Sequence, residues 1–272
     1  MSMSVGDKVF AGSIPENYDR YLVPLIFQSY AEDMARRVGA LSPKIVLETA
    51  SGSGVVTRAM AAVLSPETRY VATDLNQPML DYAKSRQVGH MRLSWRQADA
   101  QELPFDDALF EVVCCQFGAM FFPDRVKAYR EAKRVLKPGG LFVFNVWDRI
   151  EQNVFADNVT EALGELFPDD PPRFLARTPH GYHDVALIRS ELQAAGFTDL
   201  SIETKAQQSR APSPRHPAVA YCQGTPLRNE IEAKGASALE AATGHAAKFI
   251  AVRHGSGEAS AKIQAHVITT VT

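Results

Sequence analysis

Cysteine is scarce in this chain, and the three that occur are Cys114, Cys115 and Cys222. Their number is odd and their spacing matches no zinc motif, so we expect neither a disulfide framework nor a metal site. Cys114 and Cys115 are adjacent in a run typical of a strand, where neighbouring side chains point to opposite faces. We therefore predict buried, reduced thiols, as in a cytoplasmic protein.

The chain also lacks long apolar runs and an excess of charge of one sign. No apolar run approaches the ~18 residues that span a bilayer, and the opening MSMSVGDKVF lacks the layout of a signal peptide. The formal net charge is -2, and no long run of Lys and Arg occurs. We expect no membrane span, no secretion signal and no nucleic-acid partner. The sequence carries no signal for an oligomeric state.

What the chain does contain is an alternation of strand-like and helix-like segments along 272 residues, enough to bury a full core. The predicted strands are 45–47, 70–73, 93–97, 112–117, 141–147, 200–205 and 263–271. The predicted helices are 22–38, 55–64, 77–87, 124–136 and 184–195. Such alternation predicts an α/β fold of the Rossmann-like, doubly wound kind. Its seven-stranded, mostly parallel sheet would carry helices on both faces.

The domain organisation follows from where this alternation is interrupted. We expect a single domain over residues 1–272, with residues 1–40 as an N-terminal helical cover and 41–147 as the cofactor-binding core. Residues 148–183 and 207–258 interrupt the pattern. Insertions of this length in an α/β domain are usually functional, and both would leave or return near strand ends. We expect them to form a helical lid over the substrate site.

A cluster of small residues joins the first core strand to the next helix, in the run VLETASGSGVVTRAM from Val46 to Met60. Glycine at such a turn lets a ligand approach the backbone, and a helix N-terminus offers free N–H groups. Asp74 ends the next strand, 20 residues after Gly54. A carboxylate there suits the two hydroxyls of a ribose. The pattern indicates a nucleoside-containing ligand, either a nicotinamide dinucleotide or S-adenosylmethionine.

Two residues favour S-adenosylmethionine over a dinucleotide. The dinucleotide fingerprint has Gly or Ala at the position of Thr57, for helix–strand packing. Glu48 lies four residues before Gly52, where its carboxylate can hold the turn by accepting backbone N–H bonds and its charge suits a cationic ligand. An NAD(P)-dependent oxidoreductase remains the alternative in another enzyme class. A cofactor-binding protein without transfer activity is the non-enzymatic alternative.

Tyr129 and Lys133 match the Tyr-x-x-x-Lys pair of short-chain dehydrogenases. That family has a catalytic Ser about a dozen residues before the Tyr, whereas this chain has Gln116 thirteen residues before Tyr129. Its glycine motif is absent as well. A four-residue spacing on a helix is common by chance, so we interpret this pair as part of a surface helix.

Four stretches in order resemble the class I S-adenosylmethionine-dependent methyltransferase family: VLETASGSG, VATDLNQPMLDYAK, WRQADAQELPFDDALFEVVCCQFGAMFF and EAKRVLKPGGLFVF. The resemblance is strong from about Ile45 to Trp147. It continues more weakly through Gly181 to His183 and Ala194 to Phe197. It implies a methyltransferase that uses S-adenosylmethionine.

The resemblance also implies roles for residues of the first stretch. The backbone of Ala50, Ser51 and Gly52 would surround the methionine end of the cofactor, and Glu48 would support the turn. Ala50 departs from the family pattern, because many members carry Gly there. An alanine is tolerated at this position if its φ angle is negative.

The adenosine end would be bound by the next two stretches. Asp74 would accept from the ribose hydroxyls, and Leu75 and Met79 would line the adenosine. Asp99 would accept from the adenine amino group, and the N–H of Ala100 would meet a ring nitrogen. Taken alone, Asp74 or Asp99 could instead be a carboxylate that caps a loop.

The resemblance places Gln116 and Phe117 near the methionine and the transferred methyl group. The run FGAMFF from Phe117 to Phe122 suggests an apolar wall, although core packing explains most of these side chains equally well. The chain lacks the Asn/Asp-Pro-Pro-aromatic motif of DNA amino methyltransferases at this point. We therefore expect methyl transfer by in-line displacement to a small, partly apolar molecule.

No catalytic side chain is identified. The sulfonium is already a good leaving centre, so alignment in a dry site can supply most of the catalysis. A hydroxyl or protonated amine acceptor would need a base. His180 and His183 are the best-placed histidines for that task, although a lone histidine is more often a structural residue. Tyr18 and Tyr21 precede the first long helix and are candidates to touch the cofactor.

Overall fold

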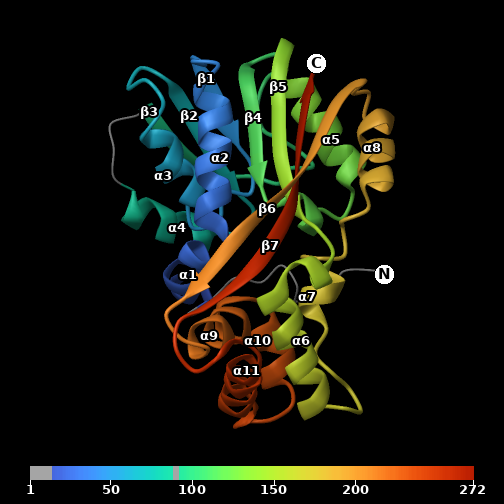
Figure 1. The fold of residues 1–272 in the computed structure, drawn as a ribbon. Coiled ribbons are helices and arrows are strands. Elements are labelled where there is room, and N and C mark those ends of the chain that lie inside the picture. Colours follow the sequence, from blue (N-terminus) through green and yellow to red (C-terminus); the bar gives the residue numbers. More distant parts are fainter. Residues whose placement is uncertain (1–13, 88–91) are drawn as a thin grey trace. The chain divides into compact units, whose positions relative to one another are not determined.

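The computed structural model describes residues 14–87 and 92–272, which form two compact units (Figure 1). The sheet unit comprises Gln28–Val146, His183–Lys205 and Ala265–Thr272. The helical unit comprises Met1–Phe27, described from Ile14 onward, with Trp147–Tyr182 and Ala206–Gln264. Residues 28–39, which we expected in the N-terminal cover, belong to the sheet unit. Residues 148–182 and 207–258, expected as insertions, fall in the helical unit.

The sheet has seven strands in the order β3-β2-β1-β4-β5-β7-β6. Their bounds are β1 Ile45–Glu48, β2 Arg69–Asp74, β3 Arg92–Gln97, β4 Phe110–Gln116, β5 Leu136–Trp147, β6 Asp199–Ala211 and β7 Ala259–Val271. The pairs β1–β2, β1–β4, β2–β3 and β4–β5 are parallel. Strand β7 runs antiparallel to β5, because Gly140 bonds to Thr272 while Asp148 bonds to Gln264. The predicted seven-stranded, mostly parallel sheet is confirmed.

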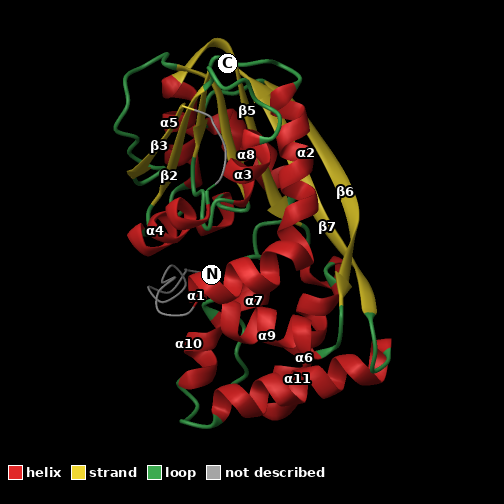
Figure 2. Cartoon of the chain, turned by 90° about the vertical axis from the view of Figure 1, so that its left-hand side faces the viewer, coloured by secondary structure: helices red, strands yellow, loops and turns green. Residues whose placement is uncertain are grey.

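Burial along β4 shows that both faces of the sheet are covered. Val112, Val113, Cys114 and Cys115 follow one another, and none is more than 1% exposed. Successive side chains of a strand point to opposite faces, so both faces must carry a layer. The helices of the sheet unit are α2 Gln28–Gly39, α3 Val55–Ala61, α4 Gln77–Arg86, α5 Arg125–Val135 and α8 Val185–Ala194. Figures 1 and 2 show these helices around the strands.

Local signals in the sequence explain where two of these helices begin. The Asp124 carboxylate accepts from the Lys127 N–H at 2.9 Å and caps α5. The Asp184 carboxylate accepts from the Ala186 N–H at 2.8 Å and caps α8. Such caps satisfy N–H groups that have no partner within the helix.

Helix α5 is buried on one side, which corrects our interpretation of its Tyr-x-x-x-Lys pair. The Tyr129 side chain is fully buried, and its ring centroid lies 5.2 Å from that of Phe144 and 5.9 Å from that of Phe142. The Lys133 ammonium donates to the carbonyl of Gly196. Tyr129 is therefore a core residue, and the two side chains form no catalytic pair.

Strand β5 begins earlier than predicted. The residues Lys137–Pro138–Gly139–Gly140 lie between the predicted helix 124–136 and the predicted strand 141–147, yet β5 already starts at Leu136. The register with β4 shifts between Phe110 and Val112, and Gly139 has a φ of 74°. The glycines thus form an irregularity within the strand, and Gly139 and Gly140 hydrogen-bond to Thr272. Pairing with β7 thus extends the strand through these glycines.

The N-terminal helix is longer and less regular than predicted. It comprises α1 Ile14–Asn17, a π-helical segment Tyr18–Phe27 and α2. Pro24 lies inside the π-helical segment. Proline has no N–H to donate to the preceding turn, so regular α-helical bonding is interrupted at this position. Pro24 therefore lies within the helical run and does not begin it.

The helical unit contains α6 Val154–Leu166, α7 Phe174–Arg177, α9 Arg215–Gly224, α10 Leu227–Glu232 and α11 Ala238–His254. Helix α11 packs against α6 and α9, and the His254 Nε2 lies 2.9 Å from the Asn158 Oδ1. Both predicted insertions are therefore largely helical. Their assignment as a lid stays a prediction.

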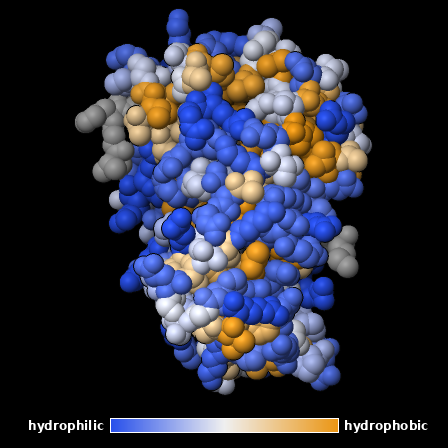
Figure 3. All heavy atoms as spheres, viewed as in Figure 1, coloured by the Kyte–Doolittle hydropathy of each residue, from blue (hydrophilic) through white to orange (hydrophobic). Residues whose placement is uncertain are grey.

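On the face seen in Figure 3, hydrophilic residues predominate and hydrophobic ones form small separate groups. Among the described residues, no helix is both long enough and apolar enough to cross a membrane. All three cysteines are free and buried. The prediction of buried thiols is therefore confirmed.

Candidate cofactor site

The last residues of three parallel strands, β1, β2 and β4, lie along one edge of the sheet. Glu48 ends β1 and is paired with Ala72 on one side and Cys114 on the other. Asp74 ends β2, and Gln116 ends β4. Chain connectivity reverses direction at β1, because β2 and β3 lie to one side and β4 and β5 to the other. Open α/β sheets bind ligands at such a reversal, outside the carboxyl ends of the strands.

The turn after β1 is tied to both neighbouring strands by its backbone. The Thr49 N–H donates to the Cys114 carbonyl at 2.9 Å, and the Ser51 N–H donates to the Thr73 carbonyl at 2.9 Å. Gly52 has a φ of 55°, which favours glycine. A side chain there would meet the Met79 Cε at 3.6 Å. The predicted glycine turn thus forms, with Met79 over it.

Ala50 occupies the same left-handed region, with a φ of 52°. Our condition that φ be negative for an alanine at this position is therefore not met. A non-glycine residue in this region costs roughly 1–2 kcal/mol. A Cβ added to Gly118 would lie 2.5 Å from the Ala50 Cβ and 2.8 Å from the Cys115 Sγ. The turns after β1 and β4 therefore touch, and the methyl of Ala50 requires glycine at position 118.

A double-mutant cycle tests this contact. Gly118→Ala should destabilise the protein by roughly 1–3 kcal/mol, because the added methyl overpacks against Ala50 and Cys115. Ala50→Gly should recover part of that loss, since it removes one of the two clashing groups. Denaturant unfolding of both single variants and the double variant measures the coupling. Additive effects, with no recovery in the double variant, would show that the two turns do not meet.

Asp74 bonds to the backbone of the glycine turn and to that of Asn76, the residue before the following helix. Its Oδ2 accepts from the Gly52 N–H at 2.9 Å, and its Oδ1 accepts from the Asn76 N–H at 2.8 Å. Burial raises the pKa of Asp74 above its ordinary value, although the N–H groups of Asn76 and Gly52 lower it. A carboxylate offers about four acceptor positions. Asp74 can therefore keep both bonds and still accept from two hydroxyls.

Glu48 is bonded differently from our expectation. Its side chain is 1% exposed, and its Oε2 accepts from the hydroxyls of Thr57 and Tyr70, the latter at 2.8 Å. We expected backbone N–H donors from the turn, and this was wrong. Burial raises the pKa of Glu48 to about 7, while the Thr57 and Tyr70 hydroxyls lower it. Glu48 therefore joins β1 to β2 and α3 within the core.

Sheet register explains the partners that sequence reasoning missed. Tyr70 is paired with Val46, and Cys114 with Glu48, so Tyr70, Glu48 and Cys114 share one face of the sheet. The Tyr70 hydroxyl lies 3.8 Å from the Cys114 Sγ. Thr57, which we used only to disfavour a dinucleotide, is fully buried against Glu48. Polar residues within apolar core segments were the available signal.

A buried polar atom tests whether the turn fits the expected cofactor. The Ser51 Oγ is buried and has no hydrogen-bond partner in the described part of the chain. A buried hydroxyl normally has a partner, so its place in this turn suits a polar ligand. Leu75, next to Asp74, is 46% exposed, as expected for an apolar residue that lines a ligand. Met79 is 3% exposed. These residues fit a nucleoside with a polar amino-acid tail.

Asp99 caps its own loop. Its Oδ1 accepts from the Gln101 N–H at 2.8 Å, and both carboxylate oxygens lie 3.2 Å from the Gln101 Nε2. Asp99 and Ala100 are half-buried. The loop-capping alternative therefore applies to Asp99, as it does to Asp74. It leaves acceptor positions on the carboxylate for a further donor.

Phe117, directly after Gln116, lies at a strained position beside the Ala50 turn. Its φ is 51°, and its N–H donates to the Asn145 carbonyl at 3.1 Å and to the Asn145 Oδ1 at 3.0 Å. Its ring centroid lies 5.4 Å from that of Tyr30 in an edge-to-face arrangement. Asn145 is the polar residue of the otherwise apolar run Leu141–Trp147, a signal that sequence reasoning missed. Met120 in the same run is buried.

The histidine candidates divide between the two units. His180 belongs to the helical unit and His183 to the sheet unit. The His180 Nδ1 lies 2.8 Å from the Asp148 carbonyl oxygen, which places a proton on Nδ1 because a carbonyl only accepts. In the described ranges, no group of three or more His, Cys, Asp or Glu side chains could hold a metal ion.

The two early tyrosines pack within the helical unit. Tyr18 stacks on Phe27 with ring centroids 4.9 Å apart. The ring of Tyr21 meets His216 edge-on at 5.1 Å. A contact of either tyrosine with the cofactor stays a prediction.

Comparison with known proteins agrees with the site. A sequence model for a methyltransferase domain matches residues 47–144. The ubiquinone/menaquinone biosynthesis C-methyltransferase UbiE of Idiomarina loihiensis is 30% identical over 166 residues, which cover 56% of this chain and 65% of that protein. The UbiE of Stutzerimonas stutzeri is 28% identical over 177 residues, covering 60% of this chain and 68% of that protein. The chain thus matches slightly under two thirds of the length of the first relative.

A solved structure extends the likeness beyond the matched domain. A crystal structure of a candidate methyltransferase from Bacillus halodurans C-125 aligns with a TM-score of 0.57, at 21% identity, over 88% of this chain and 97% of that one. At this identity the likeness shows the fold alone. The sheet order and the relatives agree with the matched domain, and residues 47–144 of the chain resemble the methyltransferase domain of S-adenosylmethionine-dependent methyltransferases.

Proposed function

We propose that this protein transfers a methyl group from S-adenosylmethionine to a small, partly apolar molecule. The observation that carries the proposal is the coupling of Asp74 to the glycine turn. One carboxylate oxygen accepts from the Gly52 N–H while the other accepts from the Asn76 N–H, just before the next helix. A ribose placed on Asp74 would therefore lie directly beside the turn, and the rest of the nucleoside would extend toward Asp99.

Each group along the sheet edge then has a task in binding. We propose that Asp74 accepts from the ribose hydroxyls, and that Leu75 and Met79 contact the adenosine. Asp99 and the Ala100 N–H would bind the adenine. Ala50, Ser51 and Gly52 would surround the methionine end, with the buried Ser51 Oγ gaining a polar partner there. Gln116 and Phe117 would lie near the methyl group, and Glu48 would hold β1, β2 and α3 together beneath.

Methyl transfer from a sulfonium depends more on the alignment of the two reactants than on a general acid or base. The cofactor supplies an activated methyl group on a sulfonium. Holding two reactants in line and away from water can lower a barrier by roughly 7–11 kcal/mol. The fixed turns after β1 and β4 suit this task, because they meet at Ala50 and Gly118. No side chain of the sheet unit is proposed as a general base.

The acceptor is proposed from the chemistry of the turn after β4 and from the relatives. Phe117 and Met120 are buried there, and Phe121 and Phe122 are half-buried, which suits an apolar acceptor. The relatives named above are C-methyltransferases of ubiquinone and menaquinone biosynthesis. We accordingly favour a carbon acceptor in a small molecule. The balanced formal charge of -2 gives no support for a nucleic-acid substrate.

The proposal is tested by binding and by transfer. We expect calorimetric titration to give binding of S-adenosylmethionine and S-adenosylhomocysteine and none of NAD. Incubation of metabolite extracts with methyl-labelled S-adenosylmethionine should give a new labelled small molecule. Binding of NAD alone would support the oxidoreductase alternative. Binding of S-adenosylmethionine without transfer to any acceptor would support the alternative of a cofactor-binding protein.

A further inference from the structure

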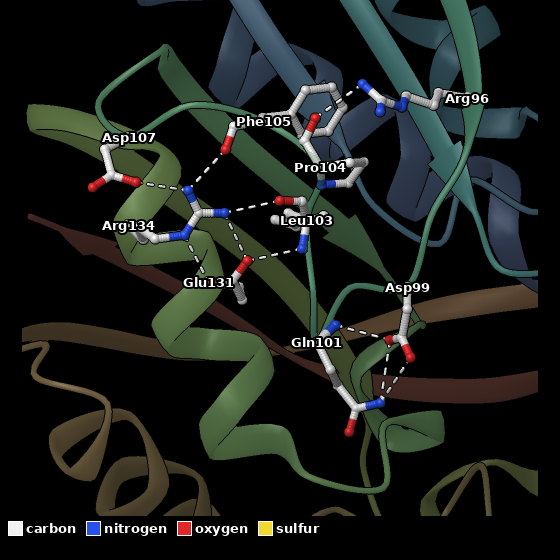
Figure 4. Close-up of polar contacts among 9 residues, drawn as sticks. All are labelled: Arg96, Asp99, Gln101, Leu103, Pro104, Phe105, Asp107, Glu131 and Arg134. Carbon is white, nitrogen blue, oxygen red and sulfur yellow. Dashed lines mark hydrogen bonds and ion pairs between the residues drawn. The ribbon is translucent and has the colours of Figure 1, made fainter.

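The segment Asp99–Asp107, all of which the structure describes, contains no helix or strand beyond one bridge between Asp99 and Glu102. We call it the 99–107 loop. It carries the carboxylate proposed to bind adenine. Loops without regular hydrogen bonding are normally the least stable parts of a fold. Its position must therefore come from side-chain contacts between the loop and the rest of the sheet unit (Figure 4).

Arg134, in the last turn of α5, holds the far part of the loop. A guanidinium has five N–H donors, and here all five have acceptors. These acceptors are the Glu131 Oε1 at 2.7 Å, the Glu131 Oε2 at 2.7 Å, the Leu103 carbonyl at 2.9 Å, the Phe105 carbonyl at 2.8 Å and the Asp107 Oδ1 at 2.7 Å. The Glu131 Oε2 also accepts from the Leu103 N–H at 2.8 Å. Three loop residues are thus fixed to one helix.

Gln101 holds the near part of the loop to the start of the same helix. Its Oε1 accepts from the Asp124 N–H at 2.9 Å, and Asp124 is the residue that caps α5. Its Nε2 donates toward both oxygens of Asp99. Figure 4 shows the Gln101 amide next to the Asp99 carboxylate. Gln101 therefore fixes the orientation of the Asp99 carboxylate relative to the N-terminus of α5.

Charge keeps the Arg134 contacts in place. Hydrogen bonding from Arg134 lowers the pKa of Glu131, so Glu131 is ionised at neutral pH and pairs with a permanent cation. Helix α5 is itself fixed on the sheet, because Ala128, Tyr129, Ala132 and Val135 are all buried. Helix α5 therefore fixes both the near and the far part of the loop relative to the sheet.

We propose that Gln101 and Arg134 are positioning residues that set the choice of purine base at Asp99. The inference rests on the proposed function. A carboxylate accepts hydrogen bonds and does not donate. When held in place it attracts the 6-amino group of adenine and repels the 6-carbonyl of hypoxanthine. A freely rotating, half-exposed carboxylate would turn toward water and would not discriminate between the two bases.

The test measures the ratio of two affinities, for S-adenosylhomocysteine and for S-inosylhomocysteine, by calorimetry. We expect the wild-type protein to prefer the adenine ligand by roughly tenfold or more, as for a hydrogen bond to a charged group. In Gln101→Leu and in Arg134→Gln that preference should fall to roughly twofold or less. The affinity for the inosine ligand should change little. A residue needed only for stability would lower both affinities together and leave the ratio unchanged.

Arg125 provides a matched control on the same helix. Its guanidinium donates to both oxygens of Glu191, at 2.8 Å and 2.9 Å, and this pair joins α5 to α8. Arg125→Gln should keep the wild-type ratio. An Arg125→Gln variant that loses the preference as fully as Arg134→Gln would overturn the proposal.

The remaining outcomes also decide the matter. Circular dichroism shows whether each variant folds, and if Arg134→Gln does not, the ratio in Gln101→Leu decides alone. A wild-type ratio in a folded Gln101→Leu variant would overturn the inference and leave the proposed function intact. A wild-type protein that binds neither ligand would overturn both.

Discussion

Glu48→Gln should remove a fall in stability that the wild-type protein shows as pH rises from about 4.5 to about 7. Burial raises the pKa of Glu48 from 4.5 to about 7. Between these values the folded state binds more protons than the unfolded state, so the free energy of unfolding decreases with pH. A shift of this size corresponds to about 3 kcal/mol. The contribution is fully present below pH 4.5 and is lost as pH rises through 7.

Glutamine resembles the protonated acid in shape and can still accept from the hydroxyls of Thr57 and Tyr70. The variant should therefore lose only the part of the pH dependence that belongs to Glu48. The raised pKa of Asp74 contributes in the same direction and remains in the variant.

Urea unfolding at pH 5 and pH 8 measures this difference. A Trp147→Phe background leaves Trp95 as the reporter, because Trp147 belongs to the helical unit. If the free energy of unfolding fell equally between pH 5 and pH 8 with and without the Glu48→Gln substitution, the assignment of a buried, proton-binding Glu48 would be contradicted.

Asp74→Ala should weaken binding of S-adenosylhomocysteine by about 1–3 kcal/mol, or roughly 5- to 150-fold. The substitution removes the acceptor for the ribose hydroxyls and also releases the Gly52 N–H. Both losses act on the same ligand. Calorimetry of the folded variant measures the effect directly.

A modified ligand separates the two losses. The 2′-deoxyadenosyl analogue lacks one of the hydroxyls that Asp74 would bind. Asp74→Ala should therefore lower the affinity for this analogue less than the affinity for the complete ligand. Asp81→Ala is the matched control, because Asp81 is an exposed carboxylate in the next helix that bonds to Gln77. Equal losses for the two ligands, or an unchanged affinity in Asp74→Ala, would rule out a ribose on this carboxylate.

The glycine turn and Asp74 were predictable because their signals are local. A turn between a buried strand and a helix, with an acid at the end of the next strand, depends only on spacing along the chain. The parallel sheet then brings Glu48, Asp74 and Gln116 to one edge without further information. The same logic gave the seven strands and the order of helices between them.

The partners of the site residues were not predictable, because sheet register and helix packing decide them. Glu48 meets Tyr70 because Tyr70 is paired with Val46, and no local pattern specifies that register. Arg134 reaches Leu103 and Phe105 across about thirty residues of sequence. The early start of β5 at Leu136 similarly depends on pairing with Thr272.

Backbone strain was hidden for the same reason. Ala50 and Phe117 both have positive φ angles, although neither residue type favours that region. The surrounding hydrogen bonds of the two turns hold them there. Strain of this kind often gathers at functional sites, and here it marks the point where the two turns meet.

The most direct measurement is a crystal structure of the protein with S-adenosylhomocysteine. The account predicts that both ribose hydroxyls bond to the carboxylate of Asp74, with the adenine amino group on Asp99 and the amino-acid tail against Ser51 and Gly52. A nucleoside bound elsewhere on the chain, or one whose ribose leaves Asp74 untouched, would contradict it.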